Sequence, residues 1–170
     1  ITEFNYLPEI HPADSAADAA NYLARVEAIP ASIDATLASL ELGVTRGLFA
    51  NAESSGRVLE MVTRQLAQPL EEWPMFAPAA RYAAIASDED AARFTAALTA
   101  ALTDGVAPAL DRYGTFIETR VLPSARSDEA PGLAGLEIGE PCYEALVRSY
   151  TTLPMSAAEV HDTGLREIAT

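Results

Sequence analysis

The fold of this chain is decided by residues 87–123, which read SDEDAARFTAALTAALTDGVAPALDRYGTFIETRVLP. Apolar residues recur here every three or four positions, which is the spacing of one face of an α-helix. Ser87 and the three acidic residues after it are typical of a helix start, because a hydroxyl can cap backbone amides and carboxylates favour the positive end of the helix dipole. The stretch predicts a long helix near 88–122, spanning roughly 50 Å.

Pro108 lies inside this pattern and disturbs it. The proline ring crowds the carbonyl group of Asp104, and proline offers no amide hydrogen to the helix. Gly105 eases a bend at the same place. We therefore expect a proline kink near Pro108, or two helices that meet at a corner.

Helical spacing continues through most of the chain, and no stretch alternates in the manner of a β-strand. Pro30 is expected to end one helix and to stand in the first turn of the next, and Gly47 is a natural left-handed stop. Asp14 and Ser15 are capping candidates for the helix that follows them, and Ser156 and Glu159 form a capping-box pattern before the last helix. Besides the long helix, helices are predicted over about 15–28, 31–46, 54–67, 140–150 and 157–170.

The predicted fold class is all-α, an array or bundle of about six to seven helices. Residues 1–170 are interpreted as one helical domain or subdomain of a larger all-α protein, because the last helix is still periodic where the sequence stops. Residues 1–12 are expected to be an extended arm, since they contain two prolines and little periodicity. Residues 69–86 and 123–139, rich in proline and in aromatic residues or glycine, are expected to be ordered connections.

Composition excludes several classes of function. The chain has 170 residues, 49% of them hydrophobic, which is sufficient for one folded core. Eleven basic residues, all arginine, face 25 acidic ones, and the net charge of −14 repels nucleic acids and anionic lipid surfaces. No apolar run is long enough to span a membrane. The location in the cell is not readable from the sequence, although a soluble, cytoplasmic protein is favoured.

No complete catalytic or metal site is found. His11 and His161 lie far apart in the sequence, and His161 has no metal-binding partner one helical turn away. Cys142 is the single cysteine, which excludes an internal disulfide, and we interpret it as a small buried apolar residue. We therefore assign no catalytic residue, no metal ligand and no cofactor to this chain.

The tyrosines of the predicted helix 140–150 are the strongest candidates for contact with a ligand. Tyr143 and Tyr150 are seven residues apart, hence on one helix face, and Thr151 and Thr152 follow at the helix end. Two interpretations remain open: core packing with locally bonded hydroxyl groups, or a polar-tipped wall that lines a groove. In the second case all four residues would face a substrate.

Much of the chain resembles the bacterial domain-of-unknown-function family 885. The more specific block comprises Gly132-Leu133, Leu136, Gly139, Tyr143, Leu146, Arg148, Tyr150-Thr151-Thr152, Ser156 to His161 and Gly164-Leu165. Supporting matches earlier in the chain are Asn21 to Arg25, Ile29-Pro30, Ile33-Asp34, Gly43 to Gly47, Leu122-Pro123 and Ala125-Arg126.

The resemblance implies an all-helical protein of several hundred residues, similar in fold to the carboxypeptidase Taq group of zinc peptidases. In such proteins a histidine–glutamate motif on a helix holds zinc, which polarises the scissile carbonyl group and activates water. That motif is expected downstream of the block matched here. Zinc, a peptide substrate and the remainder of the same protein are therefore expected only for the larger protein.

Three functions are compatible with the sequence. The first is a scaffold portion of a zinc-dependent peptidase-like hydrolase that lacks the zinc motif in this chain. The second is a free-standing acidic helical module that binds other proteins. The third is a helical bundle that binds a small ligand through the tyrosines and Trp73. Exposed apolar surface would favour the first over the second, since the scaffold must pack against its missing half.

Overall fold

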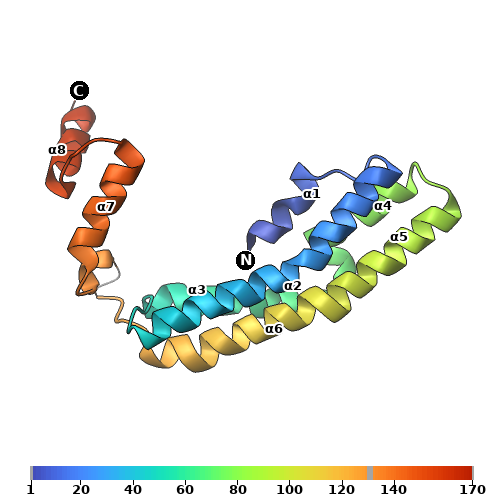
Figure 1. Ribbon diagram of the computed structural model, residues 1–170, viewed down its shortest axis with the longest axis horizontal. Coiled ribbons are helices and arrows are strands. Elements are labelled where there is room, and N and C mark those ends of the chain that lie inside the picture. The colour runs from blue at the N-terminus through green and yellow to red at the C-terminus, as the bar shows by residue number, and fades with distance from the viewer. Residues whose placement is uncertain (1, 130–131, 170) are drawn as a thin grey trace.

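The computed structural model of the chain describes residues 2–129 and 132–169. Within these ranges the protein is all-α, as predicted, and its strand-like pairing is limited to one parallel bridge between Asn51 and Arg126. Seven helices are described when the continuous helix 88–124 is counted once (Figure 1). Their labelled segments are α1 (Leu7–Ile10), α2 (Ala16–Thr45), α3 (Ala52–Ala67), α4 (Pro78–Ala83), α5 (Asp88–Ala100), α6 (Ala107–Phe116), α7 (Gly139–Thr151) and α8 (Ala157–Ile168).

The predicted helix near 88–122 is confirmed as one bent helix of 37 residues, called the long helix below. It joins α5 to α6 through a π-helical turn, Ala101–Val106, and a second π-helical turn, Ile117–Val121, follows α6. Pro108 stands in the first turn of α6, directly after the first π turn. Proline leaves a carbonyl of the preceding turn without a donor, and a wider turn accommodates this change without breaking the helix.

The prediction that Pro30 separates two helices is wrong. α2 runs continuously through Pro30, which lies in its interior. Val26, Ile29 and Ile33, on both sides of the proline, are buried on one helix face. Burying each such side chain stabilises by about 1.5–3 kcal/mol, and an interior proline costs about 3 kcal/mol. The burial of several side chains on one face therefore outweighs the proline.

Four helix ends predicted from capping residues are confirmed. The hydroxyl groups of Ser15, Ser87 and Ser156 each accept a hydrogen bond from the backbone amide three residues later. The Glu159 carboxylate in turn accepts from the Ser156 amide, which completes the capping box of α8. Gly47 has a φ of 70° directly after α2, a conformation that favours glycine.

α2 and the long helix lie side by side and run in the same direction (Figure 1). Pro30 packs on Gly105 in the first π turn: a Cβ atom added to Gly105 would lie 3.4 Å from the Pro30 Cγ atom. Two exposed ion pairs of 2.7 Å continue the same alignment, Arg112–Asp34 and Arg120–Glu41. Exposed pairs contribute little energy, so the buried contact between the helices dominates their association.

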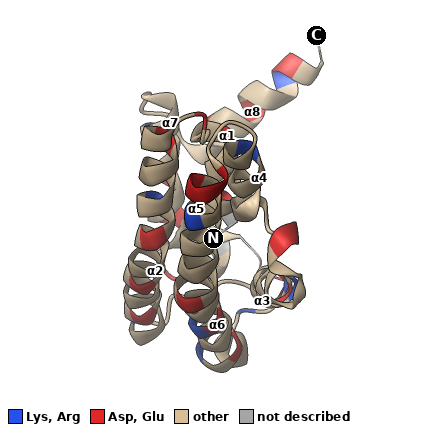
Figure 2. Ribbon diagram, turned by 90° about the vertical axis from the view of Figure 1, so that its right-hand side faces the viewer, with Lys and Arg blue, Asp and Glu red and all other residues tan. Residues whose placement is uncertain are grey.

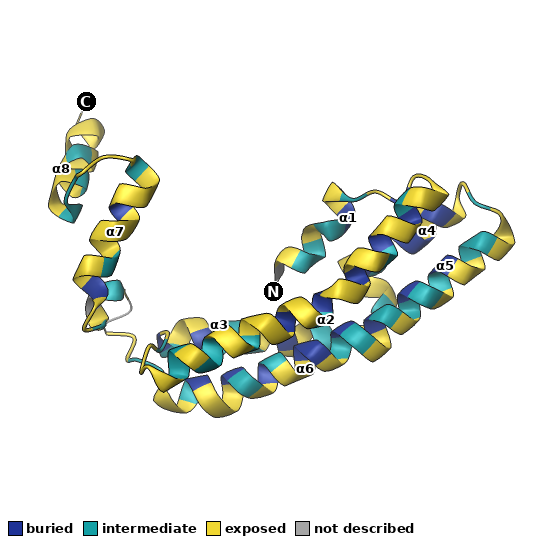
Figure 3. Cartoon of the chain, viewed as in Figure 1, coloured by how far each residue is buried: buried dark blue, intermediate teal, exposed yellow. Residues whose placement is uncertain are grey.

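The core lies between these two helices and the segments that cover them. Tyr22, Leu98, Leu102 and Val106 are fully buried, and Figure 3 shows buried residues on the facing sides of α2 and the long helix. The Tyr22 hydroxyl donates a 2.7 Å hydrogen bond to the Met75 carbonyl. Burial raises the pKa of this hydroxyl, with the nearby Arg81 acting in the opposite direction.

The segment 69–86, expected to be a connection, is largely helical. It forms 3₁₀ turns at Leu70–Glu72 and Pro74–Phe76 and then α4. Trp73 and Met75 are buried, and the Tyr82 ring meets the Phe94 ring edge-on at 5.2 Å between centroids. Its aromatic residues therefore belong to the core.

The prediction of an extended arm at 1–12 is wrong for the residues described. Thr2–Tyr6 forms a 3₁₀ turn and leads directly into α1. Pro8 lies in the first turn of α1, where a proline is compatible with a helix. Pro8 is buried, and its carbonyl group accepts a 3.1 Å hydrogen bond from Arg81.

Helices α7 and α8 form a two-helix unit, called the C-terminal hairpin below, that projects from one end of the bundle (Figure 1). The connection between the two helices runs back beside α7, so that α8 begins near the start of α7. Figure 3 shows most of its residues exposed; Gly139 and Val147 are its buried residues among those described. Of the expected connection 123–139, residues 130 and 131 lie outside the described part.

In Figure 2 acidic residues are spread over bundle and hairpin, with arginines scattered among them. In the described ranges, no helix combines the length and the apolarity that crossing a bilayer requires.

The Tyr22–Met75 hydrogen bond gives a stability prediction. Tyr22→Phe leaves the buried Met75 carbonyl without its partner, so the free energy of unfolding should fall by about 1–3 kcal/mol. Urea denaturation followed by circular dichroism measures the change. Tyr6→Phe is the control, because Tyr6 is 62% exposed and should leave stability unchanged. Equal stability of the two variants would contradict the assigned role of this bond.

Candidate functional site

A short segment at residues 126–128, called the latch, binds to the bundle in the connection that precedes the C-terminal hairpin. The Arg126 amide donates to the Ala50 carbonyl, and the Arg126 carbonyl accepts from the Ala52 amide, both at 2.9 Å. The Asp128 carboxylate accepts from the Asn51 side chain at 2.7 Å and from the Glu53 amide at 2.8 Å. These two bonds lower the pKa of Asp128, the Glu53 amide contributing most. Asp128 thus caps α3 from a distant position in the sequence.

Beyond the latch, a groove of about 820 Å³, called the hairpin groove, lies where α7 and α8 begin. One wall comes from the 3₁₀ turn Leu133–Gly135 and the residues after it, and the other from the first residues of α8. Leu133, Leu136 and Tyr143 provide apolar and aromatic surface. Three carboxylates complete the lining, those of Glu137, Glu140 and Glu144, and no arginine takes part.

The structure brings one of the four predicted site residues into this groove. Tyr143 lines it and is 46% exposed. Tyr150, on the same helix, is 87% exposed. Neither side chain therefore belongs to the core of the described protein, and the interpretation of Tyr143 as part of a groove wall agrees with its position. A role in substrate binding stays a prediction.

The two threonines have a local structural explanation. The Thr151 hydroxyl donates to the Val147 carbonyl at 2.7 Å and accepts from the Leu153 amide at 3.2 Å. Thr152 caps the end of α7 with a φ of 61°, an unusual conformation for a residue other than glycine. Its hydroxyl donates to the Thr151 carbonyl at 2.6 Å. Both threonines thus shape the turn between α7 and α8, at the end of α7 away from the groove.

The first turn of α8 closes the hairpin groove. Ser156 lines the groove while it caps α8, and its amide and hydroxyl both donate to the Glu159 carboxylate. These bonds lower the pKa of Glu159, with the Ser156 amide as the larger cause. The capping box therefore fixes the backbone at the edge of the groove.

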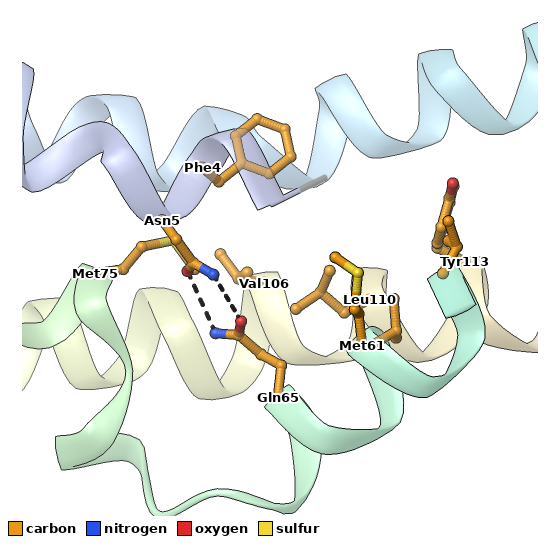
Figure 4. Close-up of a pocket in the computed structure, with 10 residues that line it drawn as sticks. Phe4, Asn5, Met61, Gln65, Met75, Val106, Leu110 and Tyr113 are labelled. Atoms are coloured by element: carbon orange, nitrogen blue, oxygen red, sulfur yellow. Dashed lines mark hydrogen bonds between the residues drawn. The ribbon is translucent and has the colours of Figure 1, made fainter. Parts of the chain in front are cut away.

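A second, smaller cavity of about 100 Å³, called the apolar pocket, lies inside the bundle and is shown in Figure 4. Segments far apart in the sequence form it: the N-terminal 3₁₀ turn, α3, the turn at Met75 and the long helix. Asn5 and Gln65 face each other there through two amide hydrogen bonds. Sequence reasoning missed this pocket, because residues 60 positions apart gave no local signal and the arm was taken to be extended.

A zinc site does not fit the described residues. No group of three or more histidine, cysteine, aspartate or glutamate side chains among them is arranged to hold a metal ion. His161 is exposed on α8, and His11 directly follows α1, which packs on the bundle apart from α8 (Figure 1). Cys142 is half-buried near the start of α7.

A comparison with protein families places the chain in one family. A family model described as "Bacterial protein of unknown function (DUF885)" matches residues 1–170. The chain belongs to the DUF885 family. Neither a curated protein nor a solved structure matches it. The membership confirms the resemblance, and the family is described as bacterial.

The glutamates of the hairpin groove were not predicted as site residues. Glu140 and Glu144 are one helical turn apart, hence on one face of α7, and that spacing was visible in the sequence. Glu137 precedes the helix, and its proximity depends on the turn before α7. Only the pair on the helix could have been found from the sequence.

The latch gives a prediction with a pH dependence. Asp128→Ala removes both bonds to the start of α3, so amide hydrogen exchange of Glu53 should become faster. Because the pKa of Asp128 is lowered in the folded protein, its contribution is present above the ordinary aspartate pKa of about 3.9 and is lost as the pH falls through the lowered value. Exchange measured by NMR at falling pH tests this dependence.

Asp111→Ala is the matched control for the latch, since Asp111 is exposed on α6. This variant should leave the exchange of Glu53 and its pH dependence unchanged. If Asp128→Ala exchanged like the control at every pH, the capping role of Asp128 would be refuted.

Proposed function

We propose that this chain forms the substrate-facing helical scaffold of a zinc-dependent, peptidase-like hydrolase of the DUF885 family. The hairpin groove is the surface that we assign to the substrate, and the catalytic metal is held by residues outside the described part. The observation that carries the proposal is the position of Tyr143 in an open groove with carboxylates on its wall. The peptidase chemistry itself rests on the resemblance of the family to zinc peptidases.

The lining of the hairpin groove suits a peptide. Leucine and tyrosine side chains offer apolar surface, and the free carboxylates attract a protonated amine or a basic side chain. The groove is wide enough for several residues, since ligand sites commonly span about 300–1,000 Å³. A peptide with a positive charge at the bound position is therefore the favoured substrate.

The exposed apolar side chains of the C-terminal hairpin support the assignment to a larger assembly. Tyr150 and Ile168 are 87% and 84% exposed, and Leu146, Leu153 and Leu165 are also largely exposed. Two helices with so little buried surface gain little stability from each other. We therefore assign this face to contact with the remainder of the same protein, its proposed partner.

The main test uses the full protein that contains this chain. With zinc bound, it should cleave peptides that carry a basic residue, and chelation of the metal should abolish cleavage. Tyr143→Ala should raise KM roughly three- to tenfold and leave kcat nearly unchanged, because the residue contributes binding and no chemistry. Tyr6→Ala is the control, since Tyr6 is exposed on the N-terminal turn and far from the groove.

Glu144→Gln sharpens the same test. It should raise KM for a peptide with arginine more than for the same peptide with citrulline, which is uncharged. Absence of metal-dependent hydrolysis in the full protein would refute the proposed activity. Normal KM values for both groove variants would refute the assignment of the hairpin groove.

The exposed hairpin face gives a separate prediction for the 170-residue chain. It should bind the dye ANS, and Tyr150→Ser with Ile168→Ser should reduce the dye fluorescence at least twofold, because apolar surface is what the dye binds. Tyr6→Ser with Ile10→Ser is the matched control, because these two residues are an exposed tyrosine and an exposed isoleucine of the N-terminal segment, away from the C-terminal hairpin. No dye binding together with a sharp melting transition would favour the free-standing interaction module instead.

A further inference from the structure

The apolar pocket has walls from four parts of the chain that meet inside the bundle. Phe4 covers it, Val58 and Met61 of α3 form one side, and Val106 and Leu110 of the long helix form another (Figure 4). All of these side chains are apolar, and no charged side chain lines the cavity. With about 100 Å³, it is somewhat smaller than an engineered cavity of ~150 Å³ that binds benzene or xenon.

The polar groups of the pocket keep unused hydrogen-bonding capacity. The Asn5 side-chain amide donates to the Gln65 oxygen at 2.9 Å, and the return bond from Gln65 to the Asn5 oxygen is long, 3.5 Å. Each primary amide has two N–H donors and two acceptor lone pairs, so this pairing uses half of the donors. A ligand can therefore bond to the pair without breaking its shorter bond.

Tyr113 adds a second polar group on the far side of Leu110 and Met61 from the amide pair (Figure 4). Burial raises the pKa of its hydroxyl, so the group is a neutral donor. In Figure 4 this hydroxyl points away from the amide pair. The polar groups that the apolar pocket offers to a guest are therefore those of Asn5 and Gln65, with apolar surface beside them.

Two features make the pocket adaptable. Met61 and Met75 are flexible side chains that adjust to the shape of a guest. Val106 is the last residue of the first π-helical turn, and such turns are frequent at functional sites. The opposite side of this turn is fixed by the contact of Gly105 with Pro30, so a guest would displace the methionines rather than the helix.

We propose that the apolar pocket binds a small uncharged molecule with a compact, branched apolar group and a hydrogen-bonding end such as a primary amide or an alcohol. The apolar group fills the space beside Val106 and Leu110, and the polar end bonds to Asn5 and Gln65. A charged end is disfavoured, because the lining offers no opposite charge to offset the cost of desolvation. This site lies apart from the hairpin groove and does not depend on the function proposed for it.

The three methionines allow a direct test, with isobutyramide as the probe. Met61 and Met75 line the pocket, whereas Met155 lies in the connection between α7 and α8. In protein labelled with ¹³C at the methionine methyl groups, isobutyramide should shift the NMR signals of Met61 and Met75 in a saturable manner and leave that of Met155 in place. Isobutyrate, the charged molecule of the same shape, should bind at least tenfold more weakly.

Two variants separate pocket binding from weak surface binding. Val58→Phe fills the cavity and should abolish the shifts. Gln65→Met removes one amide and should weaken binding of isobutyramide roughly two- to tenfold, which is the range for one hydrogen bond. Gln68→Met, just beyond the end of α3, is the matched control and should bind like the unchanged protein.

Three results would overturn the proposal: no shift of Met61 and Met75, an equal shift of Met155, or equal affinities for the amide and the carboxylate. If Val58→Phe failed to fold, the comparison of Gln65→Met with Gln68→Met would decide. Equal binding by these two variants would then refute the role of the amide pair and with it the proposed ligand class.

Discussion

The structure depends on the parallel packing of α2 against the long helix. Both helices contain a proline, and each accommodates it without a break because the buried side chains continue past it on the same face. Gly105 permits close approach at Pro30, and larger side chains fill the space on both sides of that contact. α3, the turns at 70–76 and the N-terminal segment then cover the remaining apolar surface. Most local features of the fold follow from this one pairing.

Much of the fold could be predicted from the sequence, because its signals are local. The cap residues Ser15, Ser87 and Ser156 and the stop at Gly47 act within one turn of their own position, and each was identified correctly. Pro30 was misjudged for a related reason. The expected break at Pro30 took account only of the free energy that a proline costs within its own helix. Whether the helix continued depended on burial against a second helix, about 75 residues later in the chain. The same limit explains the N-terminal segment, which is helical because it has a surface on which to pack.

In the candidate sites, too, local features could be predicted from the sequence and contacts between distant residues could not. The position of Tyr143 in a groove wall was one of the two interpretations that the sequence left open, since the spacing of Tyr143 and Tyr150 places both on one helix face without showing what that face meets. Thr151 and Thr152 were grouped with it, but their hydroxyl groups bond within the turn that ends α7. The pairing of Asn5 with Gln65, and the capping of α3 by Asp128, join residues at least 60 positions apart. No periodicity or motif reports such contacts, because they arise from the arrangement of whole helices.

α3 contacts both the latch and the apolar pocket. Its first turn is capped by the latch, and three turns of the same helix supply Val58, Met61 and Gln65 to the apolar pocket. A helix of 16 residues behaves as a short stiff rod, so its two ends cannot shift independently. A molecule held in the pocket and a change at the latch would therefore act on the same helix. Any coupling free energy between guest binding and the latch is reciprocal. If a guest stabilises the bonds of the latch, formation of the latch raises the affinity for the guest by the same factor.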